Sequence, residues 1–158
     1  MATKKPTFEQ AQLHLQVYDL RREARLRQAR DWFAKNFTAK TFDDVMKLAP
    51  EGSEAGTFVG MVTGYWEQAC LLLNYELLHE ELFFETSGEF FGVWEQLKPV
   101  VADFRKQFGD PHMLENLEKA ALRFEKWSER RSPGSIENMR KYMAQIGDKS
   151  KSAKSAKA

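Results

Sequence analysis

Apolar residues recur at intervals of three and four along most of this 158-residue chain, which is the spacing of one face of an α-helix. Thr7 with Gln10, and Thr41 with Asp44, have the spacing of capping boxes that begin helices. No segment alternates β-branched and polar residues in the way a half-buried strand does. The pattern therefore predicts an all-α fold.

The predicted elements form a single helical bundle over residues 7–147, with about six or seven helices. The first helix is long, because residues 8–37 contain neither Gly nor Pro. Further helices are expected near residues 41–49, 53–75, 77–85, 89–108, 111–131 and 135–147, and Pro99 is expected to kink the helix that Gly109 ends. We predict a flexible N-terminus at residues 1–6. Residues 148–158 are predicted to be a disordered Lys-rich tail, since small and like-charged residues bury too little surface to offset the entropy of ordering.

The long first helix has two apolar stripes on nearly opposite sides. One stripe contains Leu13, Val17, Leu20 and Ala24, and the other contains Leu15, Tyr18, Leu26, Ala29 and Phe33. A surface helix of a monomer needs only one apolar stripe. The helix is therefore either enclosed within its own bundle or exposes one stripe to another subunit.

A cluster of aromatic residues supports association as well. Phe83-Phe84 and Phe90-Phe91 are adjacent pairs, and neighbouring positions on a helix do not face the same core. We expect some of this aromatic surface to be covered by a second copy of the chain. The candidate interface is Leu13, Val17, Leu20, Phe83 and Phe90, and a homodimer is the favoured assembly.

Three glycines, Gly56, Gly60 and Gly64, are spaced four residues apart and form one ridge of the predicted helix. Each costs about 1 kcal/mol relative to alanine in a helix. Close packing of a neighbouring helix backbone against the ridge would explain all three.

Glu67 lies among large apolar residues, where an ionised carboxylate is costly without a partner. Arg105 is the expected partner, and the pair would fix how two helices pack. The functional alternative is that Glu67 acts as a catalytic acid or base.

Metal and nucleophile chemistry have little support in the sequence. Glu76 and His79 have the Glu-x-x-His spacing of di-iron bundles, but the chain contains no second such motif. Cys70 lies in an apolar helical stretch, where a thiol is ordinarily inert packing. There is no glycine-rich phosphate loop, and we predict no cofactor and no metal. One alternative function is nevertheless a small-molecule or metal-dependent enzyme with its site around Glu67, Glu76 and His79.

The formal net charge of +1 conceals an uneven distribution. Residues 1–30 sum to +4, residues 31–99 to −8, and residues 100–158 to +5. A second alternative function is a nucleic-acid accessory protein that uses these basic ends. The arginines of the first helix are scattered around its axis rather than gathered on one face, so nucleic-acid binding is not the favoured interpretation.

Three segments resemble a bacterial family of short all-helical proteins of unknown function. They are the run 65–69 (YWEQA), the run 82–85 (LFFE), and the run 94–101 (WEQLKPVV) followed by Arg105. The resemblance covers about residues 55–127. It implies an uncharacterised helical domain in the bacterial cytoplasm and brings no catalytic residue with it.

These observations favour a non-enzymatic interaction or structural module that associates with itself through apolar helix faces. The first residues lack the apolar segment of a secretory signal, so we expect a cytoplasmic location. The most apolar stretch has an uncharged part of only twelve residues, Ala55 to Trp66, so stable membrane insertion is not expected. The sequence does not identify a small-molecule ligand.

Overall fold

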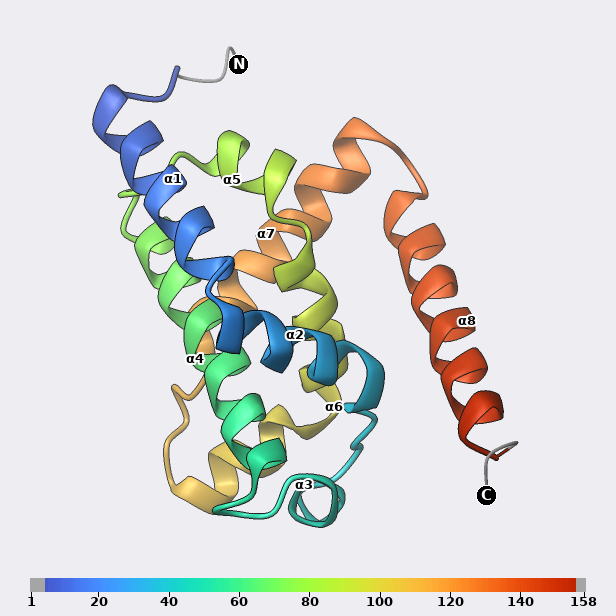
Figure 1. The fold of residues 1–158 in the computed structure, drawn as a ribbon. Helices are drawn as coiled ribbons and strands as arrows, with labels where there is room; N and C mark the ends of the chain where they lie inside the picture. Colours follow the sequence, from blue (N-terminus) through green and yellow to red (C-terminus); the bar gives the residue numbers. More distant parts are fainter. Residues whose placement is uncertain (1–4, 156–158) are drawn as a thin grey trace. The chain divides into compact units, whose positions relative to one another are not determined.

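The computed structural model describes residues 5–155, with side chains described as far as residue 147, and its described part contains eight helices and no strands (Figure 1). These are α1 (Phe8–Arg21), α2 (Ala24–Asn36), α3 (Phe42–Leu48), α4 (Glu54–Asn74), α5 (Glu80–Thr86), α6 (Glu89–Phe108), α7 (Glu115–Arg131) and α8 (Ser135–Ser155). The all-α prediction is confirmed, whereas the predicted count of six or seven is too low.

The chain divides into two compact units, residues 1–121 and residues 122–158, with the division inside α7. In the first unit α2 packs on α4, and α3 packs on α6. In the second unit α8 follows α7 through a turn at residues 132–134, where Ser128 Oγ lies 2.8 Å from Ser135 Oγ and Arg140 pairs with Glu125.

The predicted long N-terminal helix is wrong, because the chain breaks between α1 and α2. Glu23 lies at the break, and its carboxylate accepts hydrogen bonds from the backbone N–H groups of Arg25 (2.9 Å) and Leu26 (2.8 Å). These bonds cap the first turn of α2. The break divides both apolar stripes between the two helices: Leu15 and Tyr18 of the second stripe stay in α1, whereas its other members, Leu26, Ala29 and Phe33, lie in α2, where they are buried.

The core of the first unit is aromatic and is centred on α4. Trp66 is 1% exposed and its ring centroid lies 6.3 Å from that of Phe90. Phe33 of α2 stacks on Phe37 at 4.5 Å, and both are buried. A buried aromatic side chain removes roughly 150–250 Å² from water, so this cluster accounts for much of the apolar burial of the unit.

The adjacent phenylalanine pairs are all buried within the chain, contrary to the sequence prediction. Phe83, Phe84, Phe90 and Phe91 are each 2% exposed or less. The reason is the short connection between α5 and α6, which brings Phe83 and Phe84 to 5.3 and 5.9 Å from the ring of Phe90. Two adjacent side chains of α5 thus contact the same phenylalanine of α6.

The C-terminal helix is longer than the sequence indicates. Residues 148–155 continue α8 where a disordered tail was predicted, and residues 156–158 lie outside the described residues. Most of the predicted flexible N-terminus, residues 1–4, also lies outside them. Among the helices that are described, none is both long and apolar enough to cross a membrane.

The glycine ridge of α4 does not receive a neighbouring helix at its two later positions. A Cβ added at Gly60 or Gly64 would meet no neighbouring atom within 4 Å. At Gly56 it would lie 2.6 Å from the carbonyl oxygen of Pro50, which belongs to the turn before α4. Only Gly56 is therefore required by a close contact, and the contact is with the turn just before α4 rather than with a neighbouring helix.

We expect Gly56→Ala to lower the free energy of unfolding by about 1–3 kcal/mol, because the added Cβ would press on backbone rather than on a mobile side chain. The matched variant Gly64→Ala should raise it by up to about 1 kcal/mol, since alanine is the better helix former and space is available. Urea unfolding of both variants measures the difference. Equal stabilities would contradict this account of the ridge.

Candidate functional site

The outer face of α1 is the most extensive apolar surface that the first unit presents on a single helix. Phe8 is 73% exposed, Leu15 66% and Tyr18 43%, and these residues follow one stripe with the half-buried Ala11 between them. The neighbouring stripe, which contains His14 and Val17, is buried against the unit. Although α1 is a surface helix, it therefore carries apolar residues on both its buried and its exposed sides.

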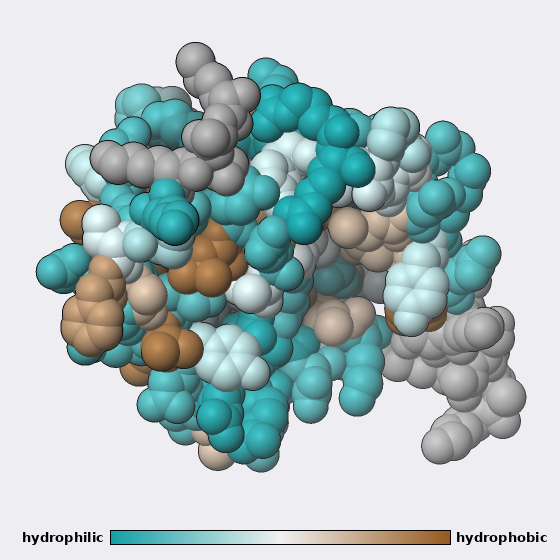
Figure 2. Space-filling view, turned by 90° about the horizontal axis from the view of Figure 1, so that it is seen from above, coloured by the Kyte–Doolittle hydropathy of each residue, from teal (hydrophilic) through white to brown (hydrophobic). Residues whose placement is uncertain are grey.

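Further apolar side chains are exposed where α4 ends. The side-chain amide Nε2 of Gln10 donates to the carbonyl of Glu76 at 3.1 Å, which fixes the first turn of α1 beside the turn that follows α4. Leu71, Tyr75 and Leu77 are exposed in this region. Figure 2 shows hydrophobic side chains gathered at its left, the side on which α1 and the end of α4 lie in Figure 1.

The predicted interface residues separate into buried and accessible ones. Phe83 and Phe90 are 0% exposed and Val17 is buried, so these three belong to the core and cannot meet a partner. Leu13 is half-buried, and Leu20 is 61% exposed. Leu20 lies about 140° around the helix from Leu15, on a different side. Of the five candidates, Leu20 is the accessible one.

Partly buried polar contacts hold α1 and α2 in place. The hydroxyl of Tyr65 donates to the carbonyl of Val17 at 2.7 Å, and burial raises the pKa of Tyr65 to about 12, so the hydroxyl stays a donor at neutral pH. The guanidinium of Arg30 makes a two-pronged contact with the carboxylate of Glu89 and also donates to the carbonyl of Arg21 at 3.0 Å. The hydrogen bonds that Arg30 donates to the carboxylate of Glu89 raise the pKa of Arg30.

His14 is a buried histidine whose tautomer follows from its neighbour. The hydroxyl of Thr86 donates to the carbonyl of Leu82 at 2.8 Å, so the same oxygen accepts from His14 Nε2, which lies 3.1 Å away. His14 therefore carries a hydrogen on Nε2, and its buried Nδ1 has no hydrogen-bond partner. Burial, together with the charge of Arg21, lowers the pKa of His14.

Glu67 and Arg105 do not pair with each other, contrary to the sequence prediction. Glu67 accepts hydrogen bonds from the backbone N–H groups of Asn116 (3.0 Å) and Leu117 (2.8 Å) and from the side chain of Asn116 (2.8 Å). Arg105 instead pairs with Glu118 and donates to the carbonyl of Met113. Both side chains hold the start of α7. Its first turn offers backbone N–H donors to the carboxylate of Glu67 and the carboxylate of Glu118 to the guanidinium of Arg105.

The proposed enzyme site does not assemble around these residues. Glu76 has a positive φ of 58° in the turn after α4, and His79 is the N-cap of α5, with Nδ1 accepting from Leu82 N at 3.4 Å. The two are therefore not one turn apart on a helix. Over the described residues, no group of three or more His, Cys, Asp and Glu side chains is arranged to hold a metal ion. Cys70 is a buried free cysteine.

The model of a sequence family described as "Domain of unknown function (DUF4760)" matches residues 6–127 of the chain. The chain belongs to the DUF4760 family. No curated protein and no solved structure matches it. The sequence resemblance to a family of unknown function is thereby confirmed.

The DUF4760 region covers α1 to α6 and most of α7. It contains the exposed face of α1, the contacts of Arg30 and His14 beneath it, and the Glu67 contact with α7. The helix α8 lies beyond it. The matched region therefore comprises the first unit from residue 6 onward and the first six residues of the second unit.

The sequence did not predict the polar contacts that position the helices. Glu23 is not among the preferred N-cap residue types, so nothing marked it as the start of α2. The Arg30–Glu89 pair joins residues 59 positions apart, and the pattern contained no signal for it. For Glu67, the useful signal was its need for a partner, but the partner is backbone, which carries no sequence signature.

We expect Glu67→Gln to lower the free energy of unfolding by about 1–2 kcal/mol. The backbone N–H groups of Asn116 and Leu117 bond to different carboxylate oxygens, and in the amide one of these positions is an NH2 group that cannot accept. The amide also lacks the charge that favours a helix N-terminus. The matched variant Arg105→Met keeps the aliphatic stem and should cost less than about 1 kcal/mol, since its ion pair is partly exposed. Urea unfolding compares them, and a larger loss in Arg105→Met would contradict the assignment.

The lowered pKa of His14 predicts a pH-dependent stability. Below the ordinary histidine value of 6.5 the unfolded chain binds a proton that the folded chain does not, so stability falls as the pH drops through 6.5 and levels off below the folded-state pKa. We expect His14→Gln to reduce this loss between pH 7.5 and about pH 5.5. Urea unfolding at both values measures it. The same pH dependence in both proteins would exclude His14 as the source.

Proposed function

We propose that this protein is a non-enzymatic helical interaction module that forms a homodimer through the exposed face of α1. The observation that carries the proposal is the uncovered stripe of Phe8, Leu15 and Tyr18 beside the exposed end of α4. Contiguous apolar surface of this kind is uncommon on monomers and is typical of interaction sites. A cytoplasmic location, expected from the sequence, is part of the same proposal.

The size of the surface suits a dimer interface. Phe8, Leu15 and Tyr18, with three exposed residues at the end of α4, leave roughly 600 Å² of side chain uncovered, at about 200 Å² for a large side chain. One side of a standard interface buries about 800 Å², including its polar rim. These six side chains therefore supply the apolar part of one such surface.

The charges at the ends of α1 suit an antiparallel pairing of two copies. Glu9 is in the first turn of α1, and Arg21 and Arg22 are at its end. When two α1 helices lie antiparallel, the acidic start of each faces the basic end of the other. The two helix dipoles then point in opposite directions, which is their favourable side-by-side arrangement. A two-fold axis near Leu15 would produce this antiparallel arrangement. Two-fold symmetry is the commonest symmetry of homo-oligomers.

We expect Leu15→Glu to convert the dimer to a monomer at micromolar concentration, because two carboxylates would be buried near the two-fold axis. Leu15 is exposed, so the fold should be retained, which circular dichroism would verify. The matched variant Gln16→Glu adds the same charge at the next, exposed position, off the apolar stripe, and should leave the dimer intact.

Light scattering coupled to size-exclusion chromatography measures the mass of each variant. A wild-type protein that is monomeric over the same concentration range, or a dimer that Leu15→Glu leaves intact, would overturn the proposal.

A further inference from the structure

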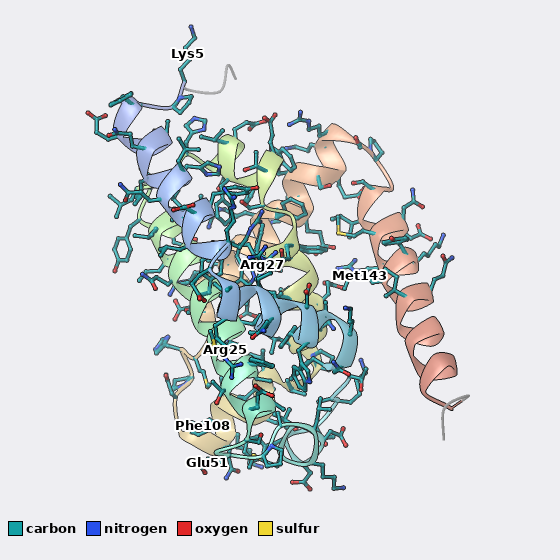
Figure 3. The ribbon with its side chains drawn as sticks, viewed as in Figure 1. Lys5, Arg25, Arg27, Glu51, Phe108 and Met143 are labelled. Carbon is teal, nitrogen blue, oxygen red and sulfur yellow. The ribbon has the colours of Figure 1, made fainter. Side chains whose placement is uncertain are left out.

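A second, separate surface of the first unit has the form of a ligand site. A groove of about 740 Å³ lies between α3, the first half of α4 and the end of α6. Pockets for small organic molecules measure about 300–1,000 Å³. Figure 3 labels Glu51 and Phe108, two lining residues, at the end of the unit where α4 begins and α6 ends.

One wall of the groove is made of three phenylalanine rings. Phe42 makes edge contacts with Phe104 at 5.7 Å and Phe108 at 6.2 Å, and Phe104 and Phe108 stack at 6.2 Å. The backbone N–H of Phe42 donates to a carboxylate oxygen of Asp103 at 3.1 Å, which ties α3 to α6 and fixes the wall. Phe108 is 61% exposed, so one ring is accessible from solvent.

Glycine keeps the α4 side of the groove open. Gly60 lines it, and an added Cβ there would meet no neighbouring atom within 4 Å. The groove is therefore open at this position, and a larger side chain at residue 60 would enter it. The nearby hydroxyls of Thr57 and Thr63 both donate to carbonyls of the chain, so their hydrogens are not available to a ligand.

The charge of the lining is carried by a single residue. Glu51 is the one ionisable residue that lines the groove, and it forms no ion pair within the described chain. A carboxylate and an accessible aromatic ring in the same groove both attract an organic cation, the first through its charge and the second through the negative face of the ring. An anionic ligand would be repelled at the same place.

We propose that this groove binds a small organic ammonium ion, with its apolar body against the phenylalanine wall and its cationic end at Glu51. The apolar lining provides affinity, and Glu51 selects the sign of the charge. The site is independent of the α1 face, which meets the opposite end of α4, so the monomeric variant Leu15→Glu should bind in the same way.

Binding can be tested with the full chain and the neutral dye Nile red, whose fluorescence rises in an apolar site. Decylammonium and decanoate, which share a chain length and differ in charge, are then used as competitors below their micelle-forming concentrations. We expect decylammonium to displace the dye at about five-fold lower concentration, which corresponds to a partly exposed ion pair of about 1 kcal/mol. Glu51→Gln should bring the two competitors to within about two-fold of each other.

Two glycine variants locate the site. Gly60→Leu places a side chain in the groove and should weaken dye and decylammonium binding at least ten-fold, while Gly64→Leu makes the same change one turn later, at an exposed position outside the lining, and should leave binding unchanged. Thermal unfolding should show both variants folded, because each position has space and leucine favours helix.

Three outcomes would overturn the proposal. Equal binding by Gly60→Leu and Gly64→Leu would place the dye elsewhere. Equal competition by decanoate and decylammonium in the unmodified protein would remove the selection for a cation. A change in oligomer mass in Gly60→Leu alone, with dye binding unaffected, would assign the groove to a second copy of the chain instead.

Discussion

The carboxylate of Glu67 accepts hydrogen bonds from three N–H groups and thereby sets the position of the first turn of α7 on α4. An ionised group in a partly buried, largely apolar setting is tolerated only where donors surround it, and the first turn of a helix offers unpaired N–H groups at that distance. Arg105 adds a second hold on the same turn through Glu118 and Met113. These contacts fix where α7 begins. They therefore also position Met113 and Leu114, which precede α7 and line the groove.

The helix α4 connects the two surfaces to which we assign functions. It spans roughly 30 Å at 1.5 Å per residue. Near its end, Tyr65 and the following turn hold α1 in place through Val17 and Gln10. Near its start, Gly60 leaves open the groove beside α3 and α6. One buried helix thus supports an apolar face for a second copy and, at the other end, a pocket with a lone carboxylate, and neither site requires the other.

The surroundings of the acidic and aromatic residues show why a catalytic interpretation is not supported. Glu67 is occupied as a helix cap, His79 caps α5, and Glu76 lies in a turn, so the three candidate catalytic groups have separate structural tasks. The contacts that are buried most deeply, such as Trp66 with Phe90, are packing contacts. Membership of the DUF4760 family adds no activity to this description.

The sequence by itself determined the helical class and most helix ends, because periodic apolar residues and caps such as Thr7 and Thr41 act over three or four neighbouring positions. It also showed that Glu67 needs a partner. Tertiary structure alone decided that Glu23 divides the first helix, that Phe83 and Phe84 both reach Phe90, and that Glu67 binds the backbone of α7. Glu23 and Glu67 bind backbone N–H groups, which every residue but proline carries, and the contacts of Phe83 and Phe84 with Phe90 depend on how the turn between α5 and α6 folds. Local patterns record propensity, whereas the partner of a buried group is fixed only when the helices have packed.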